Sequence, residues 1–498
     1  MAGVVERPFP PGDYDVVVVG SGPGGLQTSY CLRELAVRHA VLSADDGPGG
    51  MFRRFPIFER LISWTKPDAP FDRGTREYEW YDHNSLLADD PAHRALVPEF
   101  MDRAYDVPSR QEMEAGIVAF AERTGLAVRY GCRWEATRRE EDGIVLETSD
   151  GEYRCRAAVL ALGVTEPWKA EIPGVEDAPH YAETRRRDDY RGKRVFIVGK
   201  RNSGFELANG LLPWVSQIVL ASPRPAQIAV LGRSALRTRY LQPLDEYTRG
   251  GSGAYVIDVA IERIEKHDGG YRVHTHGTTW PGELVFEVDE VIVATGFRTP
   301  LRDLPELGVA TDVDGRIPAL TPFWESISAP GIYFAGNASQ GSHGLRKQGL
   351  ASNSTSVNGY RYNARVMARH LAETRFGVRL ERPTLAPDDV LPYLLSELAR
   401  APELWIQKGY LARVLSLDGE IRDDGIVPLE HFIDTAGPDA VAVAVEMDAD
   451  ATIYPAVYVR VGGQLREHAL SPHPTRAFDS EAHRRELAAC LESVRGLT

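Results

Sequence analysis

The sequence predicts an α/β fold made of two similar halves, followed by an α+β extension. Three observations predict it. A strand, a glycine-rich turn and a helix follow one another at residues 14–36 and again at residues 193–211. Each of these units leads into short strands that close on an Ala-x-Gly sequence, at 161–163 and at 294–296. Two unrelated folds rarely share this order, so we interpret it as an internal repeat at the level of a domain.

The composition is that of an ordinary globular protein of 498 residues, with a formal net charge of −14. Such a surface does not favour nucleic acid or anionic membranes as partners. No apolar run reaches the length of a membrane span, and residues 1–13 lack the apolar core of a signal peptide. The spacing of the four cysteines builds no CxxC redox pair or zinc cluster, so we expect a reducing, cytoplasmic compartment. They are Cys31, Cys132, Cys155 and Cys490.

The first glycine turn predicts a dinucleotide-binding site. Residues 14–20, YDVVVVG, are typical of a buried parallel strand, and helical sequence follows the turn. Gly20 permits the tight turn, Gly22 lets the backbone approach a pyrophosphate, and Gly25 allows close helix–sheet packing. The helix N-terminus then offers free N–H groups to the phosphates. The same turn contains Ser21, Pro23 and Gly24.

The second glycine turn departs from this pattern at one position. The stretch KRVFIVGKRNSGFELANGL keeps Gly199 and Gly204 but has Arg201 where the middle glycine stands. A side chain at this position either crowds a pyrophosphate or itself meets a phosphate. We favour a working nucleotide site, with Asn202 and Ser203 as further candidates.

Together these features resemble the flavoproteins with two dinucleotide-binding domains, and more narrowly the flavin-containing and N-hydroxylating monooxygenases. The resemblance covers residues 14 to about 375 and includes a third landmark, GIYFAGNAS, at 331–339. It implies two Rossmann-like domains, with FAD at the first turn and NADPH at the second. It also implies that Gly163 and Gly296 end the strands that carry the chain between the two domains.

The resemblance implies further contacts to FAD. Gly336 and Asn337 stand where the family holds the flavin chain, although an acidic residue is usual at position 337. The loop Gly49, Gly50 and Met51 matches the family loop beside the flavin. Ser43 stands where the family usually has a glutamate for the adenosine ribose. Ser43 itself could bond the ribose, or the neighbouring aspartates at 45 and 46 could replace the glutamate; alternatively, these aspartates form only a solvated turn.

The second nucleotide is expected to be NADPH rather than NADH. The predicted strand end at 217–227, QIVLASPRPAQ, has no acidic residue to accept a hydrogen bond from a ribose 2′-OH. Arg224 could meet a 2′-phosphate there, with Arg201 as a helper.

A closer likeness lies in YEWYDHNSLL, VPSRQEMEAGIVAFAERTGL and NGYRYNARVMARHL. These stretches resemble a subgroup that includes a flavoprotein of the animal secretory pathway. A shared compartment is not implied, because the sequence shows no signal peptide.

The resemblance implies an enzyme in which NADPH reduces the flavin. The reduced flavin reacts with O₂ to a C4a-hydroperoxide, which oxygenates a soft nucleophile. The expected substrate is a small amine or amino-acid-like metabolite that is N-hydroxylated. Disulfide reduction would need a thiol pair, and a Baeyer–Villiger oxygenase would need an FxGxxxHxxxW-like signature, which residues 161–198 lack. The alternatives are an oxidoreductase or oxidase without oxygen transfer, and a flavin-bound interaction module without catalysis.

Asn84 is the candidate catalytic residue, because the family has an Asn-Ser pair beside the flavin and the nicotinamide. The alternative for DHNSLLADD is a helix N-cap. Trp64, Lys66 and Trp80 lie in the same insertion and either line the cavity or belong to the core or surface.

The stretch at 340–371 predicts a helix that points its N-terminus at the flavin. His343, Arg346 and Lys347 in this stretch either anchor a carboxylate-bearing substrate or form a solvated basic turn, and we favour the turn.

The predicted domains are a split FAD domain, an NAD(P)H domain and a C-terminal α+β domain. Their bounds are 1–167 and 299–378 for FAD, 168–298 for NAD(P)H, and 379–498 for the last domain. The last domain is expected to be helical at 388–415, a two-stranded hairpin at 440–462 and helical again at 481–497. We favour a homodimer contact for it, over a lid on the active site or a partner-binding surface.

Overall fold

A computed structural model describes residues 7–58, 60–226, 253–301, 304, 307–312, 314–349, 351–492 and 494. The chain divides into two compact units. Unit 1 comprises Met1–Arg53, Ser63–Val164 and Thr299–Thr498, and unit 2 comprises Arg54–Ile62 and Thr165–Arg298. The finer boundaries predicted from the sequence stay a prediction.

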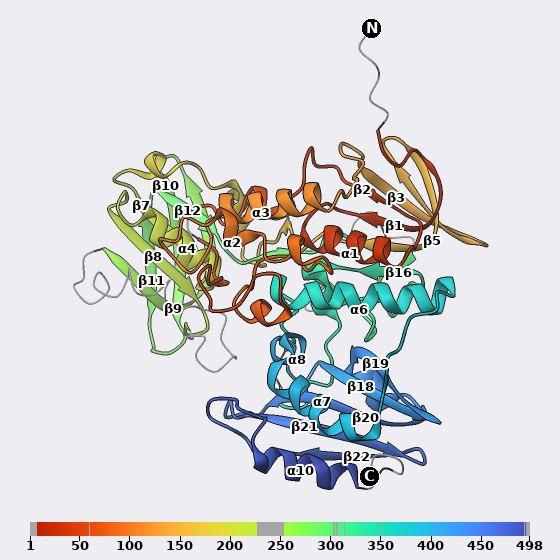
Figure 1. Cartoon of the computed structure of the whole chain (residues 1–498). Coiled ribbons are helices and arrows are strands. Elements are labelled where there is room, and N and C mark those ends of the chain that lie inside the picture. Colours follow the sequence, from red (N-terminus) through yellow and green to blue (C-terminus); the bar gives the residue numbers. More distant parts are fainter. Residues whose placement is uncertain are drawn as a thin grey trace. The chain divides into compact units, whose positions relative to one another are not determined.

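Unit 1 begins with a six-stranded sheet in which β1 lies between β2 and β5 (Figure 1). β1 pairs in parallel with β2 and β5, and β16 pairs in parallel with β5. This confirms the predicted buried parallel strand. β3 and β4 continue the sheet as an antiparallel meander. The strands are β1 (Gly12–Val19), β2 (His39–Leu42), β3 (Trp134–Glu140), β4 (Gly143–Thr148), β5 (Gly151–Leu160) and β16 (Ile332–Phe334).

Helix α6 packs against α1 beside this sheet (Figure 1). The sequence predicted a helix over 340–371, directly after the GIYFAGNAS landmark. The observed helix, α6, begins later and covers Val357–Phe376. A 3-10 turn, Gly336–Gly341, and a loop precede it. The other helices of this part are α1 (Pro23–Glu34), α2 (Val97–Phe100) and α3 (Arg110–Arg123). In the described ranges, no helix combines the length and the apolar character that a bilayer-spanning segment needs.

Unit 2 repeats the pattern of unit 1. Its six-stranded sheet has the order β11-β10-β9-β8-β7-β12, with β7 parallel to both β8 and β12. The predicted internal repeat is therefore confirmed. The elements are β7 (Arg194–Val198), α4 (Asn202–Leu211), β8 (Gln217–Ser222), β9 (Ala254–His267), β10 (Gly270–Gly277), β11 (Glu283–Val288) and β12 (Glu290–Val293). A short ladder joins β6 (Glu166–Pro167) to β13 (Phe297–Arg298).

The C-terminal part of unit 1 holds a second six-stranded sheet, larger than the predicted hairpin. The hairpin at 440–462 is confirmed as β20 and β21, and the last helix as α10. The expectation of helix throughout 388–415 is wrong at its end, because helical structure stops at Ile406 and a strand begins at Leu411. The sheet order is β17 (Thr384–Leu385), β19 (Glu420–Pro428), β18 (Leu411–Asp418), β20 (Asp439–Met447), β21 (Ile453–Val461) and β22 (Gln464–Ala469). The helices are α7 (Pro387–Arg400), α8 (Pro402–Ile406), α9 (Leu429–Asp434) and α10 (Glu481–Leu491).

The alternation AVAVAV in β20 explains why this sheet is covered on both faces. Val441, Val443 and Val445 point to one face and join the apolar cluster formed with α7, α8 and α10. The intervening alanines point to the other face, where the cluster includes Phe432 of α9 and the partly buried Leu345. A strand that is buried on both sides carries small and branched apolar residues and no polar stripe.

A buried ionic network ties the C-terminal sheet to the insertion around residues 76–80. The Arg76 guanidinium donates to Glu397 at 2.8 and 3.1 Å and to Glu403 at 2.8 Å. Arg413 of β18 also pairs with Glu397, at 2.8 Å. Burial is the largest influence on Glu403 and pushes its pKa upward, but the charges of Arg76 and Arg413 and the hydrogen bond from Arg76 together outweigh it and leave that pKa below its ordinary value.

Replacing Arg76 with methionine is expected to destabilise unit 1. The substitution leaves Glu403 buried without its partner, although Arg413 still faces Glu397. We expect the free energy of unfolding to fall by about 2–3 kcal/mol in chemical denaturation. Arg400→Met is the control, because the Arg400 side chain is 67% exposed and its ion pair with Asp479 is long, at 3.8 Å. This control substitution should change the free energy of unfolding by less than about 0.5 kcal/mol. Equal losses in both variants would contradict the role of the network.

Candidate functional site

Two glycines of the first turn are required by close packing of backbone on backbone. Gly20 has a φ of +116°, and a Cβ there would lie 2.4 Å from the carbonyl oxygen of Ala161. A Cβ on Gly25 would lie 1.9 Å from the carbonyl oxygen of Gly20. These two positions hold the strand, the turn and the helix together whether or not a ligand is bound.

Gly22 differs, because neither its conformation nor its protein neighbours require glycine. It is extended, with φ −74° and ψ 177°, and a Cβ there would meet only the Cα of Gly50, at 3.6 Å. No side chain caps the N-terminus of α1, which begins at Pro23. Free N–H groups at this N-terminus and the open space over Gly22 form a cradle that a pyrophosphate fits.

The structure brings the three predicted flavin segments together at this cradle. The N–H of Gly49 donates to the carbonyl of Ser21 at 3.1 Å, and Met51 lies in the 3-10 turn that follows, Gly50–Arg53. On the other side, a Cβ on Gly24 would lie 2.4 Å from the Cα of Gly336. The loop at 49–51 and the landmark at 336–337 therefore both lie against the first turn.

Ser43 lies at the end of β2, beside the turn. Its buried hydroxyl is 2.9 Å from the Ser21 hydroxyl and accepts from the N–H of Asp45 at 3.2 Å. Asp46 is exposed and pairs with Arg53 at 2.5 Å, and this hydrogen bond lowers the pKa of the Asp46 carboxyl. Of the acceptors proposed for a ribose, Ser43 and Asp45 are therefore the two that this ion pair leaves available.

Asn337 keeps part of its amide available. Its Oδ1 and its backbone carbonyl accept from Gln340 Nε2, at 2.7 and 2.9 Å. No hydrogen bond donated by its Nδ2 is found within the described residues. Asn337 can therefore donate a hydrogen bond to a ligand, whereas the acidic residue usual in the family would accept one.

Asn84 is buried and held in one orientation. Its Nδ2 donates to Thr65 Oγ1 at 2.9 Å and to the Ser63 carbonyl at 3.0 Å, so only its Oδ1 is left to accept. The Asp82 carboxylate receives the N–H groups of Asn84 and Ser85, at 3.0 and 3.1 Å. The helix N-cap alternative is wrong for Asn84 and Ser85, because residues 83–90 are not helical and the segment is an Asp-centred turn. Asp82 was missed, although an aspartate two residues before the Asn-Ser pair is a turn signal.

The aromatic residues of the insertion have different surroundings. Lys66 lies over the Trp64 ring, 5.0 Å from its centroid, and Trp64 packs on His83. Trp80 packs on Trp405, with ring centroids 5.1 Å apart. Trp80 therefore belongs to the contact with the C-terminal sheet, in agreement with its core or surface alternative.

The second glycine turn has the same backbone contacts as the first. Gly199 has a φ of +124°, and its Cβ would lie 2.5 Å from the Ala294 carbonyl oxygen. A Cβ on Gly204 would lie 2.4 Å from the Gly199 carbonyl oxygen. Arg201 is extended, with φ −110° and ψ −166°, and its side chain is exposed. The position that corresponds to Gly22 thus accepts a side chain without strain, and Arg201 does not fill the turn.

Of the remaining predicted residues, Asn202 and Ser203 lie in the first turn of α4. Asn202 opens the helix with a buried Oδ1 that has no hydrogen-bond partner in the described part of the chain, and Ser203 follows in the first turn. Arg224 is exposed beyond β8. The predicted segment 217–227 ends on Gln227, which lies outside the described residues. The Gly296 carbonyl accepts from His180 at 2.9 Å, and Gly163 has a φ of +68°.

The structure adds one ion pair that the sequence did not reveal. Asp258 of β9 is the register neighbour of Ser222 at the end of β8. Its carboxylate pairs with Lys200, whose side chain is 1% exposed and also donates to the Ile257 carbonyl at 2.7 Å. A carboxylate therefore does lie at the end of β8, but it comes from the neighbouring strand β9 and is paired with Lys200.

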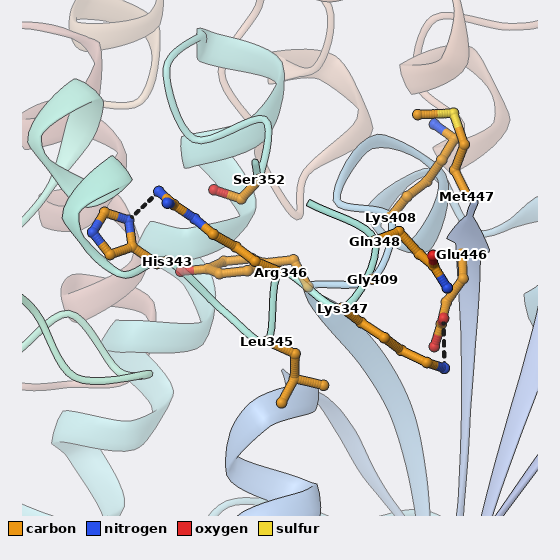
Figure 2. Close-up of a pocket in the computed structure, with 11 residues that line it drawn as sticks. His343, Leu345, Arg346, Lys347, Gln348, Ser352, Lys408, Gly409, Glu446 and Met447 are labelled. Atoms are coloured by element: carbon orange, nitrogen blue, oxygen red, sulfur yellow. Dashed lines mark hydrogen bonds and ion pairs between the residues drawn. The ribbon is translucent and has the colours of Figure 1, made fainter. Parts of the chain in front are cut away.

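The loop after Gly341 is more than a solvated basic turn. His343, Arg346 and Lys347 line a cavity together with residues of the C-terminal sheet (Figure 2). Lys347 pairs with Glu446 of β20 at 3.1 Å. The preference for a solvated turn is therefore wrong for Lys347.

No thiol pair accompanies these sites. All four cysteines are described, and each is buried and outside any disulfide.

Comparisons with known proteins agree with this architecture. The family model for pyridine nucleotide-disulphide oxidoreductases matches residues 17–336. The chain is 24% identical to "FAD-dependent oxidoreductase domain-containing protein 2" of Danio rerio over 466 residues, which cover 82% of this chain and 65% of that protein. This chain therefore spans less than two thirds of that relative's length.

Two further relatives carry different activities in their names. The ferredoxin–NADP reductase of Thermus thermophilus is 27% identical, over 60% of this chain and 84% of that protein. A probable indole-3-pyruvate monooxygenase, YUCCA9 of Arabidopsis thaliana, is 27% identical, over 44% of this chain and 50% of that protein.

Among solved structures, the ornithine N-hydroxylase of Kutzneria sp. 744 shares the fold. Its TM-score is 0.55 at 15% identity, covering 73% of this chain and all of that chain. The expected α/β fold and the expected class of two-domain oxidoreductase are confirmed. Because the family model matches well over half of the sequence, the chain belongs to the pyridine nucleotide-disulphide oxidoreductase family.

Proposed function

We propose that this chain is an FAD-dependent, NADPH-using monooxygenase that oxygenates a soft nucleophile, with the nitrogen of a small amine or amino-acid-like metabolite as the substrate atom. The observation that carries the proposal is the pair of matching glycine turns. Each follows a strand that has parallel neighbours on both sides, and each leaves an uncapped helix N-terminus at its middle position, Gly22 or Arg201. Such a pair suits an enzyme that brings one dinucleotide to another.

The residues of unit 1 fit FAD. The free N–H groups of α1 face the space over Gly22 and would bind the pyrophosphate, and Ser43 would bond the ribose. Asn337 would donate its amide hydrogen to the flavin chain. Asn84, whose amide nitrogen is already occupied, would offer a fixed acceptor to a substrate or nicotinamide. When bound, FAD supplies hydride acceptance and oxygen activation, which no side chain provides.

The residues of unit 2 favour NADPH. Arg201 and Arg224 are exposed cations near the glycine turn and beyond the end of β8, where a dinucleotide places its 2′ group. Asp258 would repel a 2′-phosphate, but Lys200 neutralises it. Among the described residues, the site therefore offers positive charge and no unpaired carboxylate at the end of β8.

Oxygen transfer is favoured over disulfide reduction, because the four cysteines are buried, form no disulfide and are not placed as a redox pair by sequence spacing. The likeness to a ferredoxin–NADP reductase supports a second candidate, an oxidoreductase without oxygen transfer. The two candidate functions differ in where the electrons from NADPH go: into a hydroxylated product in the monooxygenase, and into another acceptor in the oxidoreductase.

The first prediction concerns reduction of the flavin. Without oxygen, NADPH is expected to bleach the yellow purified protein at concentrations at least tenfold below those needed for NADH. Stopped-flow absorbance measures the rate of flavin reduction by each of the two nucleotides. Bleaching by neither nucleotide would contradict the proposed function. If oxygen and an amine are then added, a hydroxylated amine should account for the NADPH consumed; peroxide release with every amine favours the second candidate.

The second prediction separates the cradle from the packing of the turn. Gly22→Ala adds a methyl group that only Gly50 approaches, so the apoprotein should keep its stability within about 0.5 kcal/mol. The same methyl group occupies the space of the pyrophosphate, so the FAD content should fall at least tenfold. Gly47→Ala is the control, because a Cβ there meets nothing within 4 Å. Full FAD occupancy in Gly22→Ala would show that the cofactor does not lie over this turn.

The third prediction concerns the choice of nicotinamide nucleotide. Lys200→Met frees the charge of Asp258, so the preference for NADPH over NADH in flavin reduction should fall at least tenfold. The double variant Lys200→Met/Asp258→Asn removes the carboxylate as well and should recover most of the preference. An unchanged preference in the single variant, with folding verified by circular dichroism, would contradict the role of the pair.

A further inference from the structure

Two stretches that lie far apart in the sequence meet in unit 1, one around Asn84 and the other in the first turns of α6. Arg361 of α6 donates to the Ser85 carbonyl at 2.8 Å, across 276 positions of the sequence. The next residue, Tyr362, donates its hydroxyl hydrogen to the Glu79 carboxylate at 2.7 Å. The first stretch contains the Asn84–Ser85 pair, so α6 contacts the segment that carries the candidate catalytic residue.

The backbone N–H groups of the Asn84–Ser85 pair are held by Asp82. One oxygen of its carboxylate accepts from both N–H groups, at 3.0 and 3.1 Å, and from the Thr65 hydroxyl at 2.8 Å. Because Thr65 gives its only hydroxyl hydrogen to Asp82, its oxygen accepts from Asn84 Nδ2, at 2.9 Å. The Asp82 carboxylate therefore fixes the backbone of the pair and, through Thr65, the amide group of Asn84.

The other side of the pair is held by Arg361. While its Nη1 donates to the Ser85 carbonyl, its Nη2 donates to the Tyr362 hydroxyl at 3.1 Å and to the Glu79 carbonyl at 3.2 Å. A guanidinium group is planar, so three acceptors leave it one position. The Ser85 hydroxyl is also engaged, because it accepts from the Val97 N–H at 2.9 Å. The pair is thus clamped between an acidic and a basic side chain.

The two side chains of this clamp, Asp82 and Arg361, are each only 1% exposed. Both line one cavity that encloses about 230 Å³. Burial opposes the charge of Arg361, but its acidic and phenolic neighbours outweigh burial and raise the pKa of the guanidinium. Burial of two charges is costly, and a turn that only reverses the chain does not require it. Buried ionic groups of this kind gather at functional sites.

The segment that follows the pair is fixed to α1, and α6 is fixed to the Gly336 landmark. Gln27 of α1 is fully buried; it accepts from the Leu87 N–H at 2.7 Å and donates to the Leu87 carbonyl at 3.0 Å. Asn363 of α6 donates to Ser339 at 3.0 Å, in the 3-10 turn that begins at Gly336. The clamp is therefore attached to the elements that carry the proposed FAD contacts.

We propose that Asp82 and Arg361 are positioning residues that hold Asn84 so that its Oδ1 accepts a hydrogen bond from the substrate or the nicotinamide. This proposal rests on the proposed function and deepens it. Two hydrogen bonds already occupy Asn84 Nδ2, so the oxygen is left for a ligand. It suits an N–H donor, either the amine of the substrate or the carboxamide of the nicotinamide. An acceptor that is fixed in advance needs no reorganisation when the ligand binds.

The test compares Asp82→Asn and Arg361→Lys with the wild type in the full chain. In the apoprotein, hydrogen exchange followed by mass spectrometry should show the N–H groups of residues 84 and 85 exchanging at least fivefold faster in Asp82→Asn. In the protein loaded with FAD, flavin reduction by NADPH or amine hydroxylation, at saturating concentrations, should slow at least tenfold in both variants. The FAD content should stay within twofold of the wild type. The step that slows identifies the ligand of Asn84.

A milder pair of variants keeps the test valid if the buried charges prove necessary for folding. Thr65→Val removes only the hydroxyl between Asp82 and Asn84 and should slow the same step severalfold. Thr65→Ser keeps the hydroxyl and should restore the rate to within twofold of the wild type. A purely structural role predicts no such difference at matched stability.

The control is Arg76→Met, which is expected to destabilise the same unit through partners in the C-terminal part. Its rates should stay within twofold of the wild type. Equal slowing in Arg76→Met, or unchanged rates in Asp82→Asn, Arg361→Lys and Thr65→Val, would overturn this proposal alone. Wild-type flavin that NADPH does not reduce would contradict the proposed function and overturn this proposal with it.

Discussion

The structure depends on the approach of backbone to backbone at the glycine turns. In both halves the turn glycine, Gly20 or Gly199, presses on the carbonyl of an alanine at the end of a neighbouring strand, Ala161 or Ala294. No other residue has both the conformation and the space for this contact. It sets the strand end, the turn and the helix start in one arrangement, and the candidate ligand sites are built on that arrangement.

Within this frame, the middle position of each turn is available to a ligand. Gly22 and Arg201 have the same extended backbone, and their protein neighbours demand no particular side chain. Glycine at the first position leaves room for phosphates, and arginine at the second adds charge to the site. The two halves thus share their packing and differ in the chemistry that they offer. These two positions would therefore help the chain to distinguish the two proposed nucleotides, FAD at Gly22 and NADPH at Arg201.

The C-terminal sheet is an integral part of unit 1. Its core is divided between the valine and alanine faces of β20. Arg76 reaches from the insertion to Glu397 and Glu403, and Gln407 holds the loop that leads into α6. These contacts place Lys408 and Glu446 beside the loop that follows Gly336. A part of the chain that the sequence left without a motif thereby forms one wall of a charged cavity.

The sequence by itself determined the α/β class, the repeat and both glycine turns, because these depend on local spacing and strand–turn–helix order. The roles of the site residues that it named stay predictions. It also indicated the hairpin at 440–462 through its alternation. It did not reveal β18 as a strand, since LARVLSLD has no feature that rules out a helix. Only the tertiary structure paired Lys200 with Asp258, because their contact joins side chains 58 positions apart. The tertiary structure also placed the Asp82 carboxylate where it accepts from the N–H of Asn84, and it left Lys408 without a carboxylate partner among the described residues. Such features depend on which elements lie side by side, because the packing of neighbouring elements determines which side chains are buried and which charges are paired.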